Sequence, residues 1–218
     1  MARKAIIGEY DTAAQGWTLC ACALDPPAWR ENLVDVPGMD GALDLSPYPS
    51  GEVAYSPRTL SITLECSCGT RDSRETAIDA MVNALDGKSL KITLPDGVDH
   101  YVRGRVRVAR QYSDLAHAQV IVSATCDPYR YKAAPTTVTG TVPESGTLSL
   151  TLANERRPVV PTVEVSAAAT LTFGGKDIAV AAGSHRSLDI RLAAGSNTLA
   201  VTAAAGTTVS VTYQEASL

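Results

Sequence analysis

Two Cys-x-Cys pairs are the residues of this sequence whose types and spacing could most directly do chemistry. Cys20 and Cys22 form one pair, and Cys66 and Cys68 form the other. Side chains two residues apart on a strand point the same way, so two adjacent strands could present four sulfur ligands. Structural zinc sites more often place Cys-x(2–4)-Cys on turns, and both pairs here continue an apolar alternation. We therefore favour core packing over metal binding, and expect neither a metal nor a cofactor.

Arginine alternates with valine through the predicted strand 101–108, which places three arginines on one face: Arg103, Arg105 and Arg107. One interpretation is a basic stripe that meets an acidic partner. The other, which periodicity alone favours, is the solvated face of a half-buried sheet. Gly104 interrupts the apolar face of the same strand, which indicates a bulge or a close approach of two backbones.

The aspartates and histidines form no recognisable motif. Asp35, Asp40 and Asp44 lie in an irregular segment, but their spacing matches no calcium loop, and turn or capping roles are more common. The histidines are His100, His117 and His185. The sequence lacks a His-Glu-x-x-His pattern, a Gly-x-Ser-x-Gly elbow and a phosphate-binding glycine loop. We expect no enzyme; a hydrolase would require His100 or His117 to lie in a pocket beside a carboxylate.

Composition excludes several classes of protein. The chain has 218 residues, 45% of them apolar, and a formal net charge of −4. This charge is not the basic footprint of a nucleic-acid binder. No run approaches the roughly 20 apolar residues that span a membrane, and the apolar stretch at 5–7 is too short for a signal peptide. An odd number of cysteines without an export signal argues against a disulfide framework, so we expect a protein made in the cytoplasm.

Alternation and turn residues predict the elements of the first 132 residues. Strands are expected at 17–23, 60–68, 90–94, 101–108 and 116–126. One helix is expected at 72–86, with Asp72 and Glu75 at capping-box spacing and Gly87 as its stop. The segment 32–55 is rich in proline, glycine and aspartate, and a long connection of this kind inside a compact domain is often functional.

The amino-acid composition of the sequence changes at 132–137. Beyond this point alanine, threonine, valine, glycine and serine dominate, and about eight short strand-like segments are separated by glycine turns. We therefore predict a mainly β protein with two domains, at 1–132 and 138–218. Sugar sites usually stack a ring on exposed aromatic side chains. After Lys132 only Phe173 and Tyr213 are aromatic, and both lie in strand-like runs, so a sugar-binding second domain has little support.

Several stretches, in this order, resemble the distal tail protein (Dit) family of long-tailed, siphovirus-type bacteriophages. In the first domain the resemblance rests on an opening strand (16–19), a Pro-Gly and Asp-Gly loop (34–45) and the segment that leads into the next strand (55–58). It also rests there on an aromatic-x-Gly-Arg strand (100–106) and a closing Pro-Tyr-x-Tyr segment (127–131). In the second domain it rests on the entry into a second sandwich (154–165), a Gly-x-Asn turn (194–199) and a closing strand (208–215). The cysteine pairs depart from the family, as does the pair Arg156 and Arg157, where a glycine is common.

The resemblance implies a β-sandwich-like first domain with one α-helix, followed by a galectin-like or carbohydrate-binding-module-like β-sandwich. It implies a viral structural protein of the virion, at the tail tip or baseplate. The first domain would form a homo-hexameric ring that joins the tail tube protein to the tail-associated hub protein, without nucleic acid or membrane. The alternative is a carbohydrate-binding adhesin module. A ring needs two complementary surfaces, and our candidates for ring or partner contacts are Pro37, Asp40, Asp44, Arg58, Arg103, Arg105 and Arg107.

Overall fold

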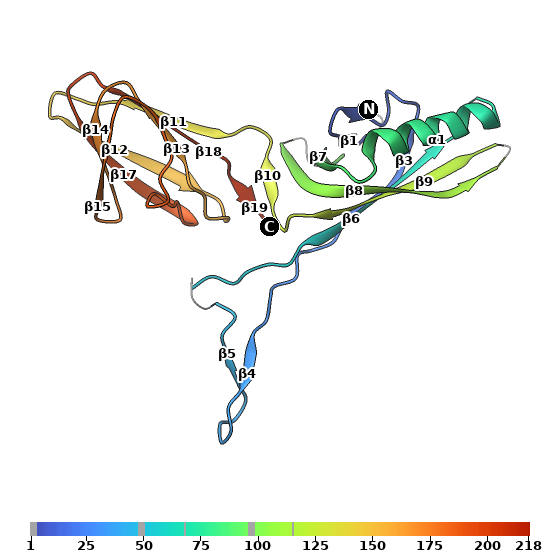
Figure 1. The fold of residues 1–218 in the computed structure, drawn as a ribbon, viewed down its shortest axis with the longest axis horizontal. Coiled ribbons are helices and arrows are strands. Elements are labelled where there is room, and N and C mark those ends of the chain that lie inside the picture. Colours follow the sequence, from blue (N-terminus) through green and yellow to red (C-terminus); the bar gives the residue numbers. More distant parts are fainter. Residues whose placement is uncertain (1–3, 48–50, 68, 96–98, 115) are drawn as a thin grey trace. The chain divides into compact units, whose positions relative to one another are not determined.

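The computed structural model describes residues 4–47, 51–67, 69–95, 99–114 and 116–218 (Figure 1). The chain divides into two compact units, Met1–Arg130 together with Leu218, and Tyr131–Ser217. Nearly all elements are strands, which confirms the predicted mainly β fold. Among the described residues, no helix is long and apolar enough to cross a membrane.

The first unit is built on an antiparallel sheet with the strand order β2-β1-β7-β8-β9-β6-β3. The bounds are β1 (Ile6–Ile7), β2 (Tyr10–Asp11), β3 (Thr18–Leu24), β6 (Arg58–Cys66), β7 (Ser89–Thr93), β8 (His100–Ser113) and β9 (Ala118–Cys126). Two short strands, β4 (Leu33–Asp35) and β5 (Ala42–Asp44), pair only with each other and form a separate ribbon. The segment expected to be irregular at 32–55 therefore contains this ribbon.

Strict alternation in β6 and β9 gives the sheet one buried face. Leu60, Ile62 and Leu64 of β6 are fully buried, and they join Val120 and Val122 of β9 in one core. The residues between them point to the other face, where threonine and serine are tolerated. The predicted half-buried strand at 60–68 is observed, but it ends at Cys66, and Cys68 lies outside the described residues.

Helix α1 (Arg71–Leu85) covers the buried face of this sheet, and contacts β8 and β9 (Figure 1). Ile78, Met81 and Leu85 form its buried stripe, as the spacing predicted. The capping prediction is wrong in detail, because Thr70 is the N-cap and its hydroxyl accepts a hydrogen bond from the amide of Ser73. Thr70, and not Asp72, precedes the first residue of the helix, where its hydroxyl can accept a hydrogen bond from an amide that has no partner within the helix.

The second unit contains two four-stranded antiparallel sheets, with the orders β11-β18-β13-β16 and β12-β17-β14-β15. The bounds are β11 (Thr136–Thr141), β12 (Thr147–Asn154), β13 (Thr162–Val165), β14 (Ala169–Phe173), β15 (Lys176–Val180), β16 (Gly183–His185), β17 (Gly195–Ala203) and β18 (Thr208–Tyr213). Valines of one sheet and leucines of the other share a single core, so this unit is a β-sandwich. The short strands β10 (Arg130–Lys132) and β19 (Ala216–Ser217) pair with each other.

A buried carboxylate ties the ends of the second unit together. Glu215 is buried, and its Oε1 atom lies 3.0 Å from the ammonium of Lys132 and also accepts a hydrogen bond from Thr136. Because Lys132 and Thr136 lie at the start of the unit and Glu215 at its end, this cluster closes the sandwich. That residues 1–132 and 138–218 are domains with separate functions stays a prediction.

Candidate functional site

The three arginines of β8 lie on the sheet face opposite α1. Arg103, Arg105 and Arg107 are exposed, while Val102 and Val106 are buried on the helix side. The Arg105 guanidinium donates a hydrogen bond to the main-chain oxygen of Gly87 at 2.7 Å, which holds this arginine against the sheet. The arginines therefore form a strip of positive charge, in which the main chain holds Arg105 in place. We call this strip, with the sheet face around it, the basic face.

Many of the other side chains on the basic face are small or carry a hydroxyl group, and Glu65, Gln119 and Ile121 lie on the same face. Strand β6 contributes threonine and serine, β9 contributes serine and threonine, and β3 contributes alanine: Thr59, Ser61, Thr63, Ser123, Thr125, Ala21 and Ala23. Lys91 is opposite Arg103 in the register of β7 and β8, and its ammonium lies 4.2 Å from the ring centroid of Tyr101. The three arginines and Lys91 give this face positive charge, which suits contact with an acidic surface.

The β4–β5 ribbon exposes apolar side chains. Leu33 is 56% exposed, Leu43 is 45% exposed, and Met39 at the ribbon tip is 43% exposed. Trp29, which comes before β4, is 61% exposed. Isolated exposed apolar residues are ordinary, but several of them on one short ribbon indicate a contact surface.

The predicted interface residues of the irregular segment lie on or beside this ribbon. Pro37 and Asp40 belong to the tip between β4 and β5, where Gly38 and Gly41 adopt positive φ angles of 83° and 77°. Asp44 ends β5, and its carboxylate accepts a hydrogen bond from the amide of Ser46 at 2.8 Å. Hydrogen bonds from Ser46 hold the pKa of Asp44 below its usual value. Asp44 therefore has the expected capping geometry and Asp40 lies in a bend at the ribbon tip, whereas Asp35 is the last residue of β4 and not a turn residue.

Arg58 takes a different position from the other predicted contacts. It starts β6 on the helix-side face of the sheet, in line with Leu60 and Ile62, and its residue exposure is only 6%. The structure thus separates the predicted contact residues into three places. The arginines of β8 are on the basic face, Pro37, Asp40 and Asp44 are on the ribbon, and Arg58 is buried.

A bulge in β3 separates the first pair of cysteines. The register with β6 shifts between Leu19 and Ala21, so Cys20 and Cys22 point to opposite faces. Cys22 packs against the core, whereas Cys20 is exposed and its thiol donates to Glu65 at 3.4 Å. The prediction of core packing is therefore wrong for Cys20, because the inserted residue inverts the alternation.

The second cysteine pair contributes one buried thiol. Cys66 is buried in the core of the first unit, as is Cys126. Across the described residues, no group of three or more histidine, cysteine, aspartate or glutamate side chains is placed to hold a metal ion.

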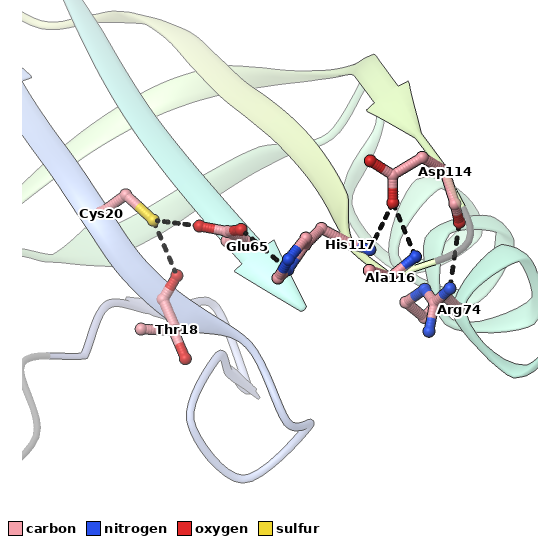
Figure 2. Close-up of polar contacts among 7 residues, drawn as sticks. All are labelled: Thr18, Cys20, Glu65, Arg74, Asp114, Ala116 and His117. Atoms are coloured by element: carbon pink, nitrogen blue, oxygen red, sulfur yellow. Dashed lines mark hydrogen bonds and ion pairs between the residues drawn. The ribbon is translucent and has the colours of Figure 1, made fainter. Parts of the chain in front are cut away.

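Glu65 links Cys20 to His117 at one end of the basic face, as Figure 2 shows. Its second carboxylate oxygen lies 3.3 Å from Nδ1 of His117. Partial burial, together with the hydrogen bond and the charge of Glu65, raises the pKa of the Cys20 thiol. A thiol stabilised in its protonated form is a poor nucleophile. Sequence reasoning missed it, because the contact depends on the bulge and on pairing between distant strands.

Asp114, which follows β8, is contacted from the helix side, as Figure 2 also shows. The Arg74 guanidinium of α1 donates to the main-chain oxygen of Asp114 at 3.0 Å. The Asp114 carboxylate accepts hydrogen bonds from the amides of Ala116 and His117 at 2.7 and 2.6 Å, which hold its pKa below the usual value. These contacts set the position of His117 on the surface.

The two histidines named for a hydrolase, His100 and His117, lie in different surroundings. His117 lies beside a carboxylate, but nearly half of its side chain is exposed. His100 lines a cavity whose described lining includes no acidic side chain.

Comparison with solved structures matches the whole chain. No protein-family model and no curated protein matches the sequence. The crystal structure of SPP1 Dit (gp 19.1) matches with a TM-score of 0.71 over 99% of both chains, at 15% sequence identity. The chain has the distal tail protein fold. The resemblance inferred from the motifs is confirmed at the level of fold.

Two more distant matches also come from phage tails. Structures of the phage P2 baseplate in its activated conformation, with Ca and with Sr, match with TM-scores of 0.45 and 0.42 at 7% identity. They cover 93% and 94% of this chain, and 92% of the matching chain in each case. SPP1 Dit is described as a paradigm of the hub adsorption apparatus in phages that infect Gram-positive bacteria.

Proposed function

We propose that this protein is a structural, non-catalytic component of a phage tail tip or baseplate. In this proposal six copies form a ring that joins the tail tube protein to the tail-associated hub protein, and the protein becomes part of the virion after synthesis in the host cytoplasm. The observation that carries the proposal is the match to SPP1 Dit over 99% of both chains.

The surfaces of the first unit support a ring. A cyclic assembly uses head-to-tail contacts, so each copy needs two different surfaces that complement each other. The ribbon offers exposed apolar side chains with aspartates beside them, and the basic face offers arginines on a rigid strand. We assign Pro37, Asp40 and Asp44 to one side of the ring contact and the arginines of β8 to the other.

The alternative function, a carbohydrate-binding adhesin, finds less support in the second unit. Residues 131–217 are all described, and their aromatic side chains are Tyr131, Phe173 and Tyr213. Tyr131 and Tyr213 are buried, and the Tyr213 hydroxyl donates to the main-chain oxygen of Ala153. Phe173 is half-buried against the sandwich core. A sugar ring therefore finds no exposed aromatic platform there.

Charge reversal in the basic face tests the ring. Arg105→Glu should raise the concentration needed for half-assembly at least about tenfold, because like charges meet at the contact. Native mass spectrometry would measure the masses over a concentration series, and negative-stain microscopy would show the rings. Arg105→Met separates loss of the Gly87 hydrogen bond from charge reversal, and Arg186→Glu, exposed in the second unit, is the matched control.

Two results would count against this proposal. If Arg105→Glu forms rings at the wild-type concentration, the basic face is not the ring contact. If the wild-type chain forms no ring either alone or on purified tail tubes, the ring itself is wrong. A wild-type monomer that binds glycans on an array would favour the adhesin.

A further inference from the structure

Both sheets of the second unit end in an unpaired edge on the same side of the sandwich. Strand β11 ends one sheet and pairs only with β18, and β12 ends the other and pairs only with β17. All residues of this unit are described, and within it no further strand takes up the main-chain hydrogen bonds of these two outer edges. A Cβ atom added to Gly140 of β11 would lie 2.8 Å from Leu148 and 3.0 Å from Leu150 of β12, so the two strands face each other across the core.

These two edges lack the features by which proteins usually prevent edge-to-edge association. Such features are charged side chains, prolines, bulges and very short strands. Residues 136–141 and 147–154 contain no charged residue and no proline, and their registers with β18 and β17 continue without a shift. On the opposite side of the sandwich, β15 begins with Lys176 and Asp177, and β16 has only three residues. Only one side of the sandwich is therefore left open to a further strand.

The sequence of β12 is suited to pair with itself. Leucines of this strand face the core and alternate with small, exposed side chains on the outer face: Leu148, Leu150, Leu152, Thr147, Ser149, Thr151 and Ala153. An antiparallel pair centred on Leu150 places leucine opposite leucine, and Ser149 opposite Thr151 of the second copy. Inner residues then meet inner residues along the whole strand, which is the condition for a defined register.

Strand β11 has the same symmetry. Exposed threonines of its outer face alternate with two residues of its inner face: Thr137, Thr139, Thr141, Val138 and Gly140. An antiparallel pair centred on Thr139 places threonine opposite threonine, and Gly140 opposite Val138. The centres of the two strands lie close together, because Gly140, next to Thr139, packs against Leu150 of β12. One twofold axis can therefore relate both pairs of strands.

Charges at the ends of β12 favour the same arrangement. The turn before β12 contains Glu144, whereas the three residues after the strand are Glu155, Arg156 and Arg157, which have a net positive charge. Antiparallel pairing brings the start of one β12 to the end of the other. Unlike charges therefore meet at both ends of the contact, and no like charges meet between them.

We propose that two copies of this protein associate edge to edge through their second units, with β11 and β12 each pairing with the same strand of the other copy. The contact consists of main-chain hydrogen bonds that continue each four-stranded sheet into the sheet of the partner copy. A single extended peptide would complete one sheet only, whereas a second copy completes both.

This contact is separate from the proposed ring and does not depend on it. A twofold contact uses the same surface on both copies, whereas a ring uses head-to-tail contacts. Edge pairing therefore doubles whatever assembly the first unit makes. Two copies are expected if the first unit forms no ring, and twelve are expected if it forms a ring of six, so each proposal can fail without the other.

A concentration series of the full-length chain, followed by sedimentation velocity and native mass spectrometry, measures this contact. The double variant Ser149→Lys with Thr151→Lys places lysine opposite lysine twice across the twofold axis. It should raise the concentration for half-association of the pair at least about tenfold. The variant with glutamate at both positions should do the same. An equimolar mixture of the two variants should associate at least as readily as the wild type, because each lysine then meets a glutamate.

The matched control is Ala179→Lys with Ala181→Lys, at exposed positions in and after β15 on the opposite side of the sandwich. It adds the same charge and should associate as the wild type does. The proposal is wrong if the wild type remains a single copy or a ring of six at about 1 mM, where even a weak pair should form. It is also wrong if the lysine variant associates as the wild type does. Failure of the mixture to recover association overturns the assigned register, and its recovery shows that both variants are folded.

Discussion

Replacement of Gly104 by alanine should destabilise the first unit. Gly104 lies in β8, directly opposite Cys126 of β9. A Cβ atom at this position would lie 2.6 Å from the Cys126 sulfur and 2.8 Å from the carbonyl oxygen of Thr125. The Thr125 oxygen belongs to the main chain, so it cannot rotate away, and the strands must separate locally.

The size of this effect follows from two opposing contributions. Forcing an extra methyl group into a packed site costs about 1–3 kcal/mol. Alanine in a strand gains about 0.5–1 kcal/mol over glycine, because it has less conformational freedom to lose on folding. For Gly104→Ala we expect a net loss of about 1–2 kcal/mol, which lowers the urea midpoint by about 0.5–1 M.

Tryptophan fluorescence is the appropriate measurement, because both tryptophans lie in the first unit. Trp17 is buried and its indole donates to the Tyr10 hydroxyl at 3.1 Å, so its emission will change when this unit unfolds. Trp29 is exposed and contributes a nearly constant background. Because the second unit has no tryptophan, its unfolding does not obscure the transition.

A second variant separates the two clashes. Cys126→Ala in the Gly104→Ala background removes the contact with sulfur but leaves the contact with the Thr125 oxygen. It should therefore recover part of the loss, measured against Cys126→Ala alone in a double-mutant cycle. A Gly104→Ala protein as stable as the wild type would refute the close approach of β8 and β9 at this point.

Two further outcomes are expected from the polar contacts. At pH 8 the Cys20 thiol should react slowly with iodoacetamide, because its raised pKa disfavours the thiolate. Glu65→Gln removes a charge that disfavours the thiolate and should raise the reaction rate roughly three- to tenfold. Peptide mapping by mass spectrometry measures both rates, and equal rates would contradict the assigned cause. Arg74→Met should destabilise the first unit by about 2 kcal/mol, because the main-chain carbonyls of Gly69 and Asp114 lose their hydrogen-bond donor. The control Arg71→Met, at an exposed position, should change the urea midpoint little. Similar midpoints for the two variants would argue against the anchoring role of Arg74.

Local periodicity is enough to predict the regular elements of the first unit. The alternation that begins at Leu60 and the apolar stripe of Ile78 and Met81 each determine their own element, because one face must be buried. The close backbone approach at Gly104 can also be read from the sequence, since a glycine inside a strand typically marks a bulge or a close approach. These features depend on residues within a few positions of one another.

Features that depend on pairing between distant strands could not be predicted. The bulge at Cys20 is invisible in the sequence, because it is defined by the register of β3 against β6. The family motif at 55–58 suggests a surface contact for Arg58, yet this residue occupies an inward position of β6 in line with Leu60. Nothing near Arg58 in the sequence identifies the other segments that line the cavity beside it. Alternation extended by one step from Leu60 does place Arg58 on the inward face, but the depth of its burial is set by tertiary neighbours, which alternation does not specify.

The β4–β5 ribbon has a consequence for the kinetics of binding. Its register pairs Leu33–Asp35 with Ala42–Asp44, and a two-stranded ribbon of this length is at best marginally stable in water. Its amides should therefore exchange with deuterium far faster than those of β6. A partner that binds the ribbon must also fix its backbone, at about 1–2 kcal/mol for each residue ordered. Part of the free energy from Leu33, Leu43 and Met39 is offset in this way, so contacts through the ribbon should form reversibly and allow misplaced subunits to dissociate.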